Sequence, residues 1–261
     1  MIKQLQQIAN FSQKQLFVCF VDLSAAFDHI NRKLLFKTLK NWLPQYHSST
    51  TIGIMENLYD KTQFYMYGAK PSEAFPTSSG VRQGGVERPP LYNYYNDYSL
   101  RVYDNRKCDA GVTGLQISYH IPEEATDRLQ KIRSPATGTS NDDESGYADD
   151  LGVFSWSAAE LQICMNILAA VFEEFGLVIN LDKTKTMIIN PCGISYPESI
   201  IIINSVDIEN VTLFKYVVVC VSHDQIHIGC DEIDNRINSA HNSFSEHRKI
   251  LTNTHIYSLA N

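Results

Sequence analysis

The sequence predicts an α+β protein in which a sheet has helices packed on one face. The first observation is that short apolar runs, which have the length of buried strands, alternate along the chain with segments of helical periodicity. The second is the stretch SGYADDLGVF at residues 145–154, which is typical of a strand, a sharp turn and a second strand. The 261 residues are 44% hydrophobic and 20% charged, which indicates one large or two small globular domains.

The first half of the chain is predicted to begin with a helix and a buried strand. Residues 2–15 have an amphipathic helical pattern, and residues 16–23 form the continuous apolar run LFVCFVDL. Asn31 is a suitable N-cap for the next helix, and Pro44 ends that helix. The elements expected after it are a helix at 50–59, a strand at 63–67, a loop rich in Pro, Gly and Ser at 69–90 and a helix at 91–103.

The second half of the chain mixes one poorly patterned region with several clear elements. Residues 105–146 are predicted to be the least ordered, because they contain the polar and acidic segment SPATGTSNDDESG. Residues 158–175 have the clearest helical spacing, and Gly176 is suited to end that helix. The later elements expected are strands at 184–189, 200–203 and 211–221, a turn at 204–205 and a closing helix at 231–251.

Three carboxylates are placed at the ends of apolar strands. Asp22 follows the first strand, and Asp149 and Asp150 occupy the turn of the predicted hairpin. If these strands are neighbours, the carboxylates converge on one edge of the sheet and need cations between them, because like charges repel. Oxygen ligands suit Mg²⁺, and two such ions about 3.5–4 Å apart can clamp an in-line phosphoryl displacement. The alternative is that Asp149 and Asp150 serve only the turn, since aspartate favours turns.

Several motifs in a fixed order carry a resemblance to a known family. FVDLSAAFDHINRKLL, GVRQGGVERPPLYNYYND, YADD and FGLVINLDKTKTM resemble the palm motifs of reverse transcriptases from non-LTR (LINE-type) retrotransposons. FKYVVVCV and EIDNRINSAHNSFSEHRKIL resemble the hairpin and the first thumb helix that follow the palm. The resemblance implies a polymerase palm-type antiparallel sheet, with a palm and partial fingers at 1–190, a primer-grip-like hairpin at 191–230 and the start of a thumb helix at 231–261.

The resemblance also implies roles for individual residues. Asp22, Asp149 and Asp150 match the catalytic residues, which bind the metal ions. Phe27 matches the bulky residue beneath the sugar, which excludes a 2′-hydroxyl; packing inside a turn is its alternative. The remaining matches are Gly80, Arg82, Gln83 and Gly84, in the loop along the incoming nucleotide and template, and Lys183, near the nucleotide phosphates.

The reaction implied by the resemblance is nucleotidyl transfer directed by RNA. A primer 3′-hydroxyl attacks the α-phosphate of a deoxynucleoside triphosphate and pyrophosphate leaves, so that positioning and charge neutralisation supply most of the catalysis. The implied cofactors are two Mg²⁺ ions, with Mn²⁺ as an alternative. The implied partners are an RNA template, a DNA primer and deoxynucleoside triphosphates.

This chain departs from the family at three places near the expected site. Glu87 stands where the family has an apolar residue, and an unpaired buried charge would displace the loop. Residues 143–146 are polar or glycine where the family has apolar residues before Tyr147, which weakens the strand that leads into the site. Val218 replaces a glycine of the later hairpin. We therefore expect the catalytic carboxylates to be preserved but the polymerase activity to be weak or absent.

Compared with the family, the chain is expected to be a truncated copy. The basic fingers motifs would lie before residue 1, and the thumb would stop after one helix. The formal net charge of −7 agrees with the loss of basic parts, because nucleic-acid binders usually carry a basic face. One alternative is therefore a catalytically inactive, retrotransposon-derived remnant.

Two further alternatives concern different chemistry. Cys220, His223, His227 and Cys230 have a spacing that could bind zinc, although the segment is expected to lie on a hairpin. Palm-like sheets with metal-binding aspartates also occur in nucleotide cyclases, but the Arg-Gln-Gly loop and the LDKTKT segment favour the polymerase.

The sequence also bears on the compartment. The N-terminal stretch MIKQLQQIANFSQ is polar, which does not suit a secretory signal, and no apolar run reaches the length of about 18 residues that a membrane helix needs. We expect an intracellular protein, in the cytoplasm or nucleus, with its 6 cysteines reduced and no membrane partner. The sequence does not indicate an oligomeric state.

Overall fold

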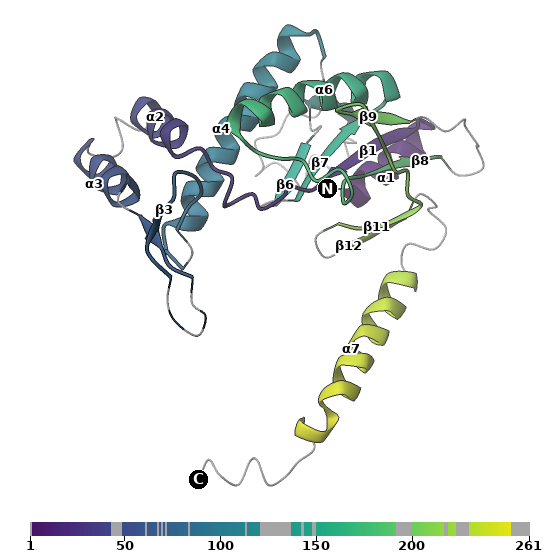
Figure 1. Ribbon diagram of the computed structural model, residues 1–261. Coiled ribbons are helices and arrows are strands. Elements are labelled where there is room, and N and C mark those ends of the chain that lie inside the picture. The colour runs from purple at the N-terminus through teal and green to yellow at the C-terminus, as the bar shows by residue number, and fades with distance from the viewer. Residues whose placement is uncertain are drawn as a thin grey trace, which may run out of the picture.

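A four-stranded antiparallel sheet forms the centre of the computed structural model (Figure 1). Its strands are β1 (Leu16–Val21), β6 (Glu144–Tyr147), β7 (Asp150–Ser155) and β8 (Lys185–Ile189), in the order β6-β7-β1-β8. The structure describes residues 2–42, 49–60, 62–66, 68, 70, 72–82, 84–112, 114–120, 137–141, 144–147, 150–191, 200–216, 219–222 and 230–251. The prediction of mixed helices and antiparallel strands is confirmed.

Strand β1 is buried along its whole length because both faces of the sheet are covered. Cys19 and Val21 pack in a cluster with α6 (Ala158–Phe175) and α4 (Arg88–Asp109). Val18 and Phe20 belong to a second cluster on the opposite face, with α1 (Ile2–Ser12) and two strands of a later hairpin. The prediction that helices cover one face only is therefore wrong, since α1 uses its apolar side to cover the other.

The predicted start of the helix after Asn31 and the predicted end of the helix at 158–175 are confirmed, whereas Pro44 lies outside the described residues. α2 (Arg32–Trp42) begins after Asn31, whose side-chain oxygen accepts a hydrogen bond of 3.2 Å from the amide of Leu34. α6 ends at Gly176, which has a φ of 71°, and the following amide of Leu177 bonds back to the helix. Glycine adopts this left-handed conformation without the strain that a Cβ atom would cause.

Between α2 and α4, the helix predicted at 50–59 is confirmed, the strand predicted at 63–67 is shorter, and a second short strand lies within the predicted loop at 69–90. α3 (Ser49–Asp60) is followed by the short strands β2 (Gln63–Phe64) and β3 (Phe75–Pro76), which pair with each other. α4 begins at Arg88, earlier than predicted, because proline is tolerated in the first turn of a helix. It also runs on to Asp109, so the start of the supposedly unordered region is helical.

Parts of residues 105–146 form strands, which corrects the prediction of a region without regular structure. β4 (Gln116–His120) pairs antiparallel with β5 (Thr137–Asn141), and β6 pairs with β7. Polar residues thus form strands here because their backbones pair with distant partners, which a local apolar pattern cannot reveal. The acidic segment before Tyr147 forms β6 where the structure describes it, although residues 142–143 lie outside the described part.

After β8 the chain makes two hairpins. β9 (Ile201–Ile203) turns through Asn204 and Ser205, both with positive φ, into β10 (Val206–Ile208). The single strand predicted at 211–221 is wrong, because β11 (Leu213–Tyr216) and β12 (Val219–Ser222) pair antiparallel with each other. Residues 217–218 lie between them, outside the described part, so Val218 is not placed.

The last element is the predicted closing helix, α7 (Cys230–Leu251). It points away from the sheet in Figure 1, and the side chains of residues 237–248 are all exposed. Among the described helices, none combines the length and the hydropathy required to span a membrane.

Candidate functional site

Asp22 directly follows β1, and its backbone is held by the loop before β8. The amide of Asp22 donates a hydrogen bond of 3.3 Å to the Thr184 hydroxyl oxygen. The carbonyl of Asp22 accepts one of 2.8 Å from the amide of Asn180. Leu23 and Ile179 form a further antiparallel bridge. Both peptide groups of Asp22 are therefore held by hydrogen bonds to the loop before β8.

The carboxylate of Asp22 is only partly satisfied by protein groups. Its Oδ2 atom is buried and accepts no hydrogen bond from the described residues. The Nζ atom of Lys183 lies 3.8 Å from Oδ2, but the Lys183 side chain is 69% exposed and that of Asp22 is 28% exposed. A buried carboxylate oxygen without a donor costs free energy, so this oxygen is available to a cation.

The pairing of β1 with β7 brings a second aspartate to the same edge of the sheet. Val21 pairs with Leu151, so the register continues to Asp22 opposite Asp150, the first residue of β7. Tyr147 pairs with Asp150, which confirms the predicted hairpin but places Asp150 in the strand and not in the turn. Only the backbone of Asp150 is described, and Asp149 lies outside the described residues.

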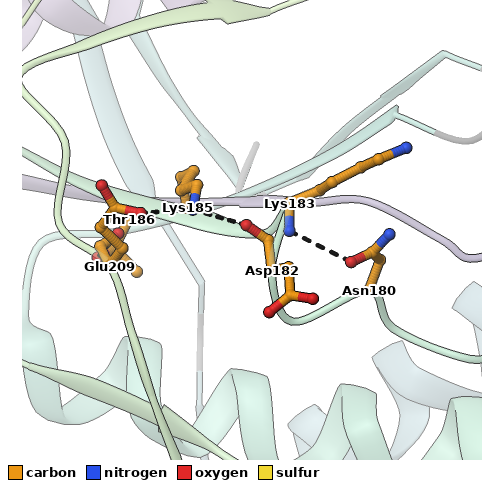
Figure 2. A network of polar contacts seen from close by, with 6 residues as sticks. All are labelled: Asn180, Asp182, Lys183, Lys185, Thr186 and Glu209. Atoms are coloured by element: carbon orange, nitrogen blue, oxygen red, sulfur yellow. Dashed lines mark hydrogen bonds and ion pairs between the residues drawn. The ribbon is translucent and has the colours of Figure 1, made fainter.

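The loop that carries Lys183 is braced by a network of polar contacts (Figure 2). Its start is closed by the amide of Lys183, which donates to Asn180 Oδ1 at 3.3 Å. Lys185 Nζ donates to the carbonyl of Asp182 at 2.6 Å and forms an ion pair with Glu209 at 2.6 Å. The side chain of Lys183 extends away from this network in Figure 2, so the backbone is fixed while the ammonium group remains exposed.

A pocket of about 420 Å³ opens beside Asp22. Its floor is aromatic, because Phe214 stacks on Phe20 with ring centroids 4.3 Å apart and Tyr216 lies 5.3 Å from the same ring. Its polar lining includes Asp22, Asp182, Lys183, Lys185 and Lys215. The combination of lysines with a carboxylate that can hold a cation suits a phosphate-bearing ligand.

Phe27 lies in the turn that follows Asp22, half-buried between two side chains. Its ring centroid is 4.4 Å from that of Tyr92, and the Arg88 guanidinium lies 4.4 Å from the ring on α4. The carbonyl of Phe27 also accepts a hydrogen bond of 3.0 Å from the amide of Val81. The ring packs against the core, as in the alternative of turn packing, but remains partly accessible.

The loop at residues 80–87, here called the glycine loop, begins next to the turn that contains Phe27 and Asp28. Gly80 has a φ of 76°, and a Cβ atom there would lie 2.9 Å from the backbone of Asp28. Only glycine allows this close approach. Gly84 also has a positive φ of 78° but faces open space. Arg82 is half-buried, and residue 83, the predicted Gln83, lies outside the described part.

The prediction that Glu87 would be an unpaired buried charge is wrong. Glu87 is only half-buried, and its Oε1 atom accepts a hydrogen bond of 3.1 Å from the Tyr59 hydroxyl. Burial raises the pKa of Tyr59, and the nearby Glu87 carboxylate raises it further. The glycine loop therefore has a partner for this charge and need not be displaced by it.

The structure brings the predicted residues into two groups. Asp22, Lys183 and the backbone of Asp150 lie at one edge of the sheet. Phe27, in the turn at residues 24–28, and the described residues of the glycine loop form the second group, joined by the hydrogen bond from the Val81 amide to the Phe27 carbonyl. The histidines of the predicted zinc spacing fall within residues 223–229, which are not described, and the described residues contain no cluster of metal-binding side chains.

Sequence reasoning missed the residues that support the site. Asn180 and Thr184 hold the end of β1, and Arg32 and Tyr59 hold the glycine loop. For Asn180 and Thr184 the segment LVINLDKT offered a signal, because asparagine and aspartate two positions apart favour a tight turn. The backbone groups of such a turn can form hydrogen bonds with a neighbouring strand. Arg32 and Tyr59 gave none, since each acts on residues far away in the sequence.

Most of the chain matches a known protein family. No curated protein matches the chain significantly. Residues 1–227 match the family described as reverse transcriptase (RNA-dependent DNA polymerase). This match covers most of the chain, from α1 to the end of β12. The chain therefore belongs to the reverse transcriptase family, and it is an RNA-directed DNA polymerase domain.

Proposed function

We propose that this domain comes from a non-LTR (LINE-type) retrotransposon and has a palm-type architecture. The palm with partial fingers would comprise residues 1–190, the primer-grip-like hairpin residues 191–230 and the start of the thumb residues 231–261. The subtype is supported by the order of the motifs FVDLSAAFDHINRKLL, GVRQGG, YADD and INLDKTKT. The palm is supported by the antiparallel sheet that has Asp22 and Asp150 at one edge.

The catalytic centre in this proposal is formed by Asp22, Asp149 and Asp150. The single observation that carries it is the buried Oδ2 atom of Asp22, which lies where β7 starts and accepts no hydrogen bond from the described residues. This oxygen fits a divalent cation, so the residues present are compatible with two Mg²⁺ ions, or with Mn²⁺. When bound, the ions would activate the primer hydroxyl and neutralise the charge that develops on the phosphates.

The remaining residues would bind and orient the substrates. Lys183 is exposed on a braced loop beside Asp22, which suits contact with the phosphates of a deoxynucleoside triphosphate. Phe27 is held in its turn by Tyr92 and would exclude a ribose 2′-hydroxyl. Arg82, Gln83 and Gly84 would lie along the incoming nucleotide and the RNA template.

Primer extension tests this function. The full chain is given an RNA template, a DNA primer, deoxynucleoside triphosphates and Mg²⁺ or Mn²⁺, beside a variant that carries Asp149→Ala and Asp150→Ala. Because Glu87 is paired with Tyr59, one of the departures from the family does not disable the loop, and we expect slow but template-dependent extension. No extension by the wild type, or equal extension by the variant, would contradict the proposal.

A further inference from the structure

Two residues of the glycine loop, Arg82 and Glu87, form hydrogen bonds with the same side chain, Tyr59 of α3. Tyr59 is 1% exposed. Its hydroxyl accepts a hydrogen bond of 3.4 Å from the amide of Arg82 and donates one of 3.1 Å to the Glu87 carboxylate. One phenol oxygen thus links the amide of Arg82 to the carboxylate of Glu87, although the glycine loop contains three glycines.

Arg32 holds the entry to the glycine loop from the other side. Its Nε donates to the carbonyl of Gly80 at 2.6 Å, and its Nη1 donates to the carbonyls of Thr77 at 2.6 Å and Tyr59 at 3.2 Å. Its Nη2 donates to the Thr77 hydroxyl oxygen at 3.0 Å. The planar guanidinium therefore cross-links the first turn of α2, the end of α3 and the residues that lead into the loop.

The environment of Arg32 indicates a positioning role and not a simple ion pair. Arg32 is 7% exposed, and in the described part of the chain no carboxylate forms a salt bridge with it. A buried charge of this kind is costly unless several hydrogen bonds satisfy it. The guanidinium also lies over the Tyr59 ring, with Cζ 5.4 Å from the ring centroid. Arg32 therefore contacts both the carbonyl and the ring of Tyr59, which fixes the two side chains relative to each other.

We propose that Arg32 and Tyr59 are positioning residues for nucleotide binding, and that Glu87 is the partner that closes the glycine loop onto Tyr59. Arg32 fixes where the loop starts, and the Tyr59 hydroxyl fixes the distance between Arg82 and Glu87. The link to the nucleotide rests on the proposed function. The link between these residues and the loop conformation does not, so the two can be tested separately.

Amide hydrogen exchange on the full chain tests the loop conformation without any need for activity. Tyr59→Phe removes one oxygen and keeps the ring, and Glu87→Leu removes the acceptor at a half-buried position. We expect exchange in residues 78–88 to become roughly tenfold faster in each variant. Glu87→Gln keeps an acceptor oxygen, so its exchange should stay close to that of the wild type.

Tyr103→Phe is the matched control. Tyr103 is also a fully buried tyrosine, but it lies fifteen residues after Arg88 on α4, roughly 22 Å along the helix. Its variant should not change exchange in residues 78–88. If Tyr59→Phe and Glu87→Leu both exchange like the wild type in this segment, or if Tyr103→Phe accelerates it equally, the positioning role is wrong.

Kinetics then separates positioning from general stability. In primer extension, Tyr59→Phe and Glu87→Leu should raise the KM for the deoxynucleoside triphosphate about tenfold while kcat changes much less, because they loosen a binding loop and leave Asp22, Asp149 and Asp150 intact. A fall in kcat with unchanged KM would overturn the link to nucleotide binding. If the wild type shows no extension, the proposed function fails, but hydrogen exchange still decides whether these residues fix the loop.

Discussion

Replacing Asp22 by asparagine should separate metal binding from folding. The Oδ2 atom of Asp22 is buried without a hydrogen bond from the described residues, a situation that costs about 1–3 kcal/mol. The pair with Lys183 offsets little of this, because an ion pair with so exposed a lysine contributes about 0–1 kcal/mol. Without metal, Asp22→Asn should therefore melt at the same temperature as the wild type or about 2–4 °C higher.

With Mg²⁺ bound, the wild type should melt at a higher temperature than Asp22→Asn. At a free Mg²⁺ concentration ten times the dissociation constant, binding to the native state stabilises it by about 1.4 kcal/mol. For a domain of this size that raises the melting temperature by about 3–6 °C. Asp22→Asn should lose most of this increase, because a neutral amide is a poor ligand for Mg²⁺.

The assay is thermal melting of both proteins over a range of Mg²⁺ concentrations. Asp182→Asn is the matched control, since Asp182 lines the same pocket but is exposed and is not one of the proposed ligands. That variant should keep the full increase. If Asp22→Asn also keeps it, the carboxylate of Asp22 does not hold the metal, and the catalytic centre has been placed at the wrong edge of the sheet.

Three further predictions follow from particular residues. Gly80→Ala should destabilise the fold by about 2–4 kcal/mol in urea unfolding, because its positive φ and the contact of 2.9 Å with Asp28 leave no space for a methyl group; an unchanged midpoint would contradict this. Phe27→Ala should lower the preference for deoxynucleotides over ribonucleotides roughly tenfold or more in primer extension, and an unchanged ratio would remove its role as a sugar gate. Burial raises the pKa of the Cys19 thiol to about 12, so native protein at about pH 8 should react with iodoacetamide at the exposed Cys108 and leave Cys19 unmodified, as peptide mass analysis would show.

Much of the fold could be predicted because local sequence patterns determine several of its helices and strands. The helix at 158–175 has an apolar residue at every third or fourth position and a glycine at its end. β1 is a continuous apolar run followed by an aspartate. The pairing of the carboxylates at one sheet edge followed from the strand ends, and the register of β1 with β7 agrees with it for Asp22 and the backbone of Asp150.

Other parts could not be predicted because they depend on distant partners. β5 has the polar sequence TGTSN, so no alternation of apolar residues indicates this partner of β4. The run FKYVVVCV has no turn residue, so its local pattern does not show the division into β11 and β12, although the family resemblance implies a hairpin there. The position of α1 on the opposite face of the sheet is likewise a property of packing, since an amphipathic pattern shows that a helix is half-buried but not against which surface.

The partner of Glu87 could not be predicted either, because it is also distant in the sequence. The sequence marks Glu87 as a charge in an apolar position, but the Tyr59 hydroxyl that donates a hydrogen bond to this carboxylate belongs to a residue 28 positions earlier. Arg32 bonds to Gly80 across 48 positions for the same reason. Candidate residues for the chemistry could be proposed from motifs, whereas the residues that hold Asp22 and the glycine loop in place could be found only from the structure.

The central claim is that the end of β1 and the start of β7 form the metal centre of the polymerase. Iron-mediated cleavage tests it most directly: Fe²⁺ replaces Mg²⁺ on the full chain, and ascorbate with peroxide cuts the backbone next to the bound ion. We expect cuts near Asp22, Asp150 and Lys183, which excess Mg²⁺ suppresses and Asp22→Asn abolishes. Cleavage confined to residues 220–230, or cuts at the sheet edge that persist in Asp22→Asn, would contradict the account.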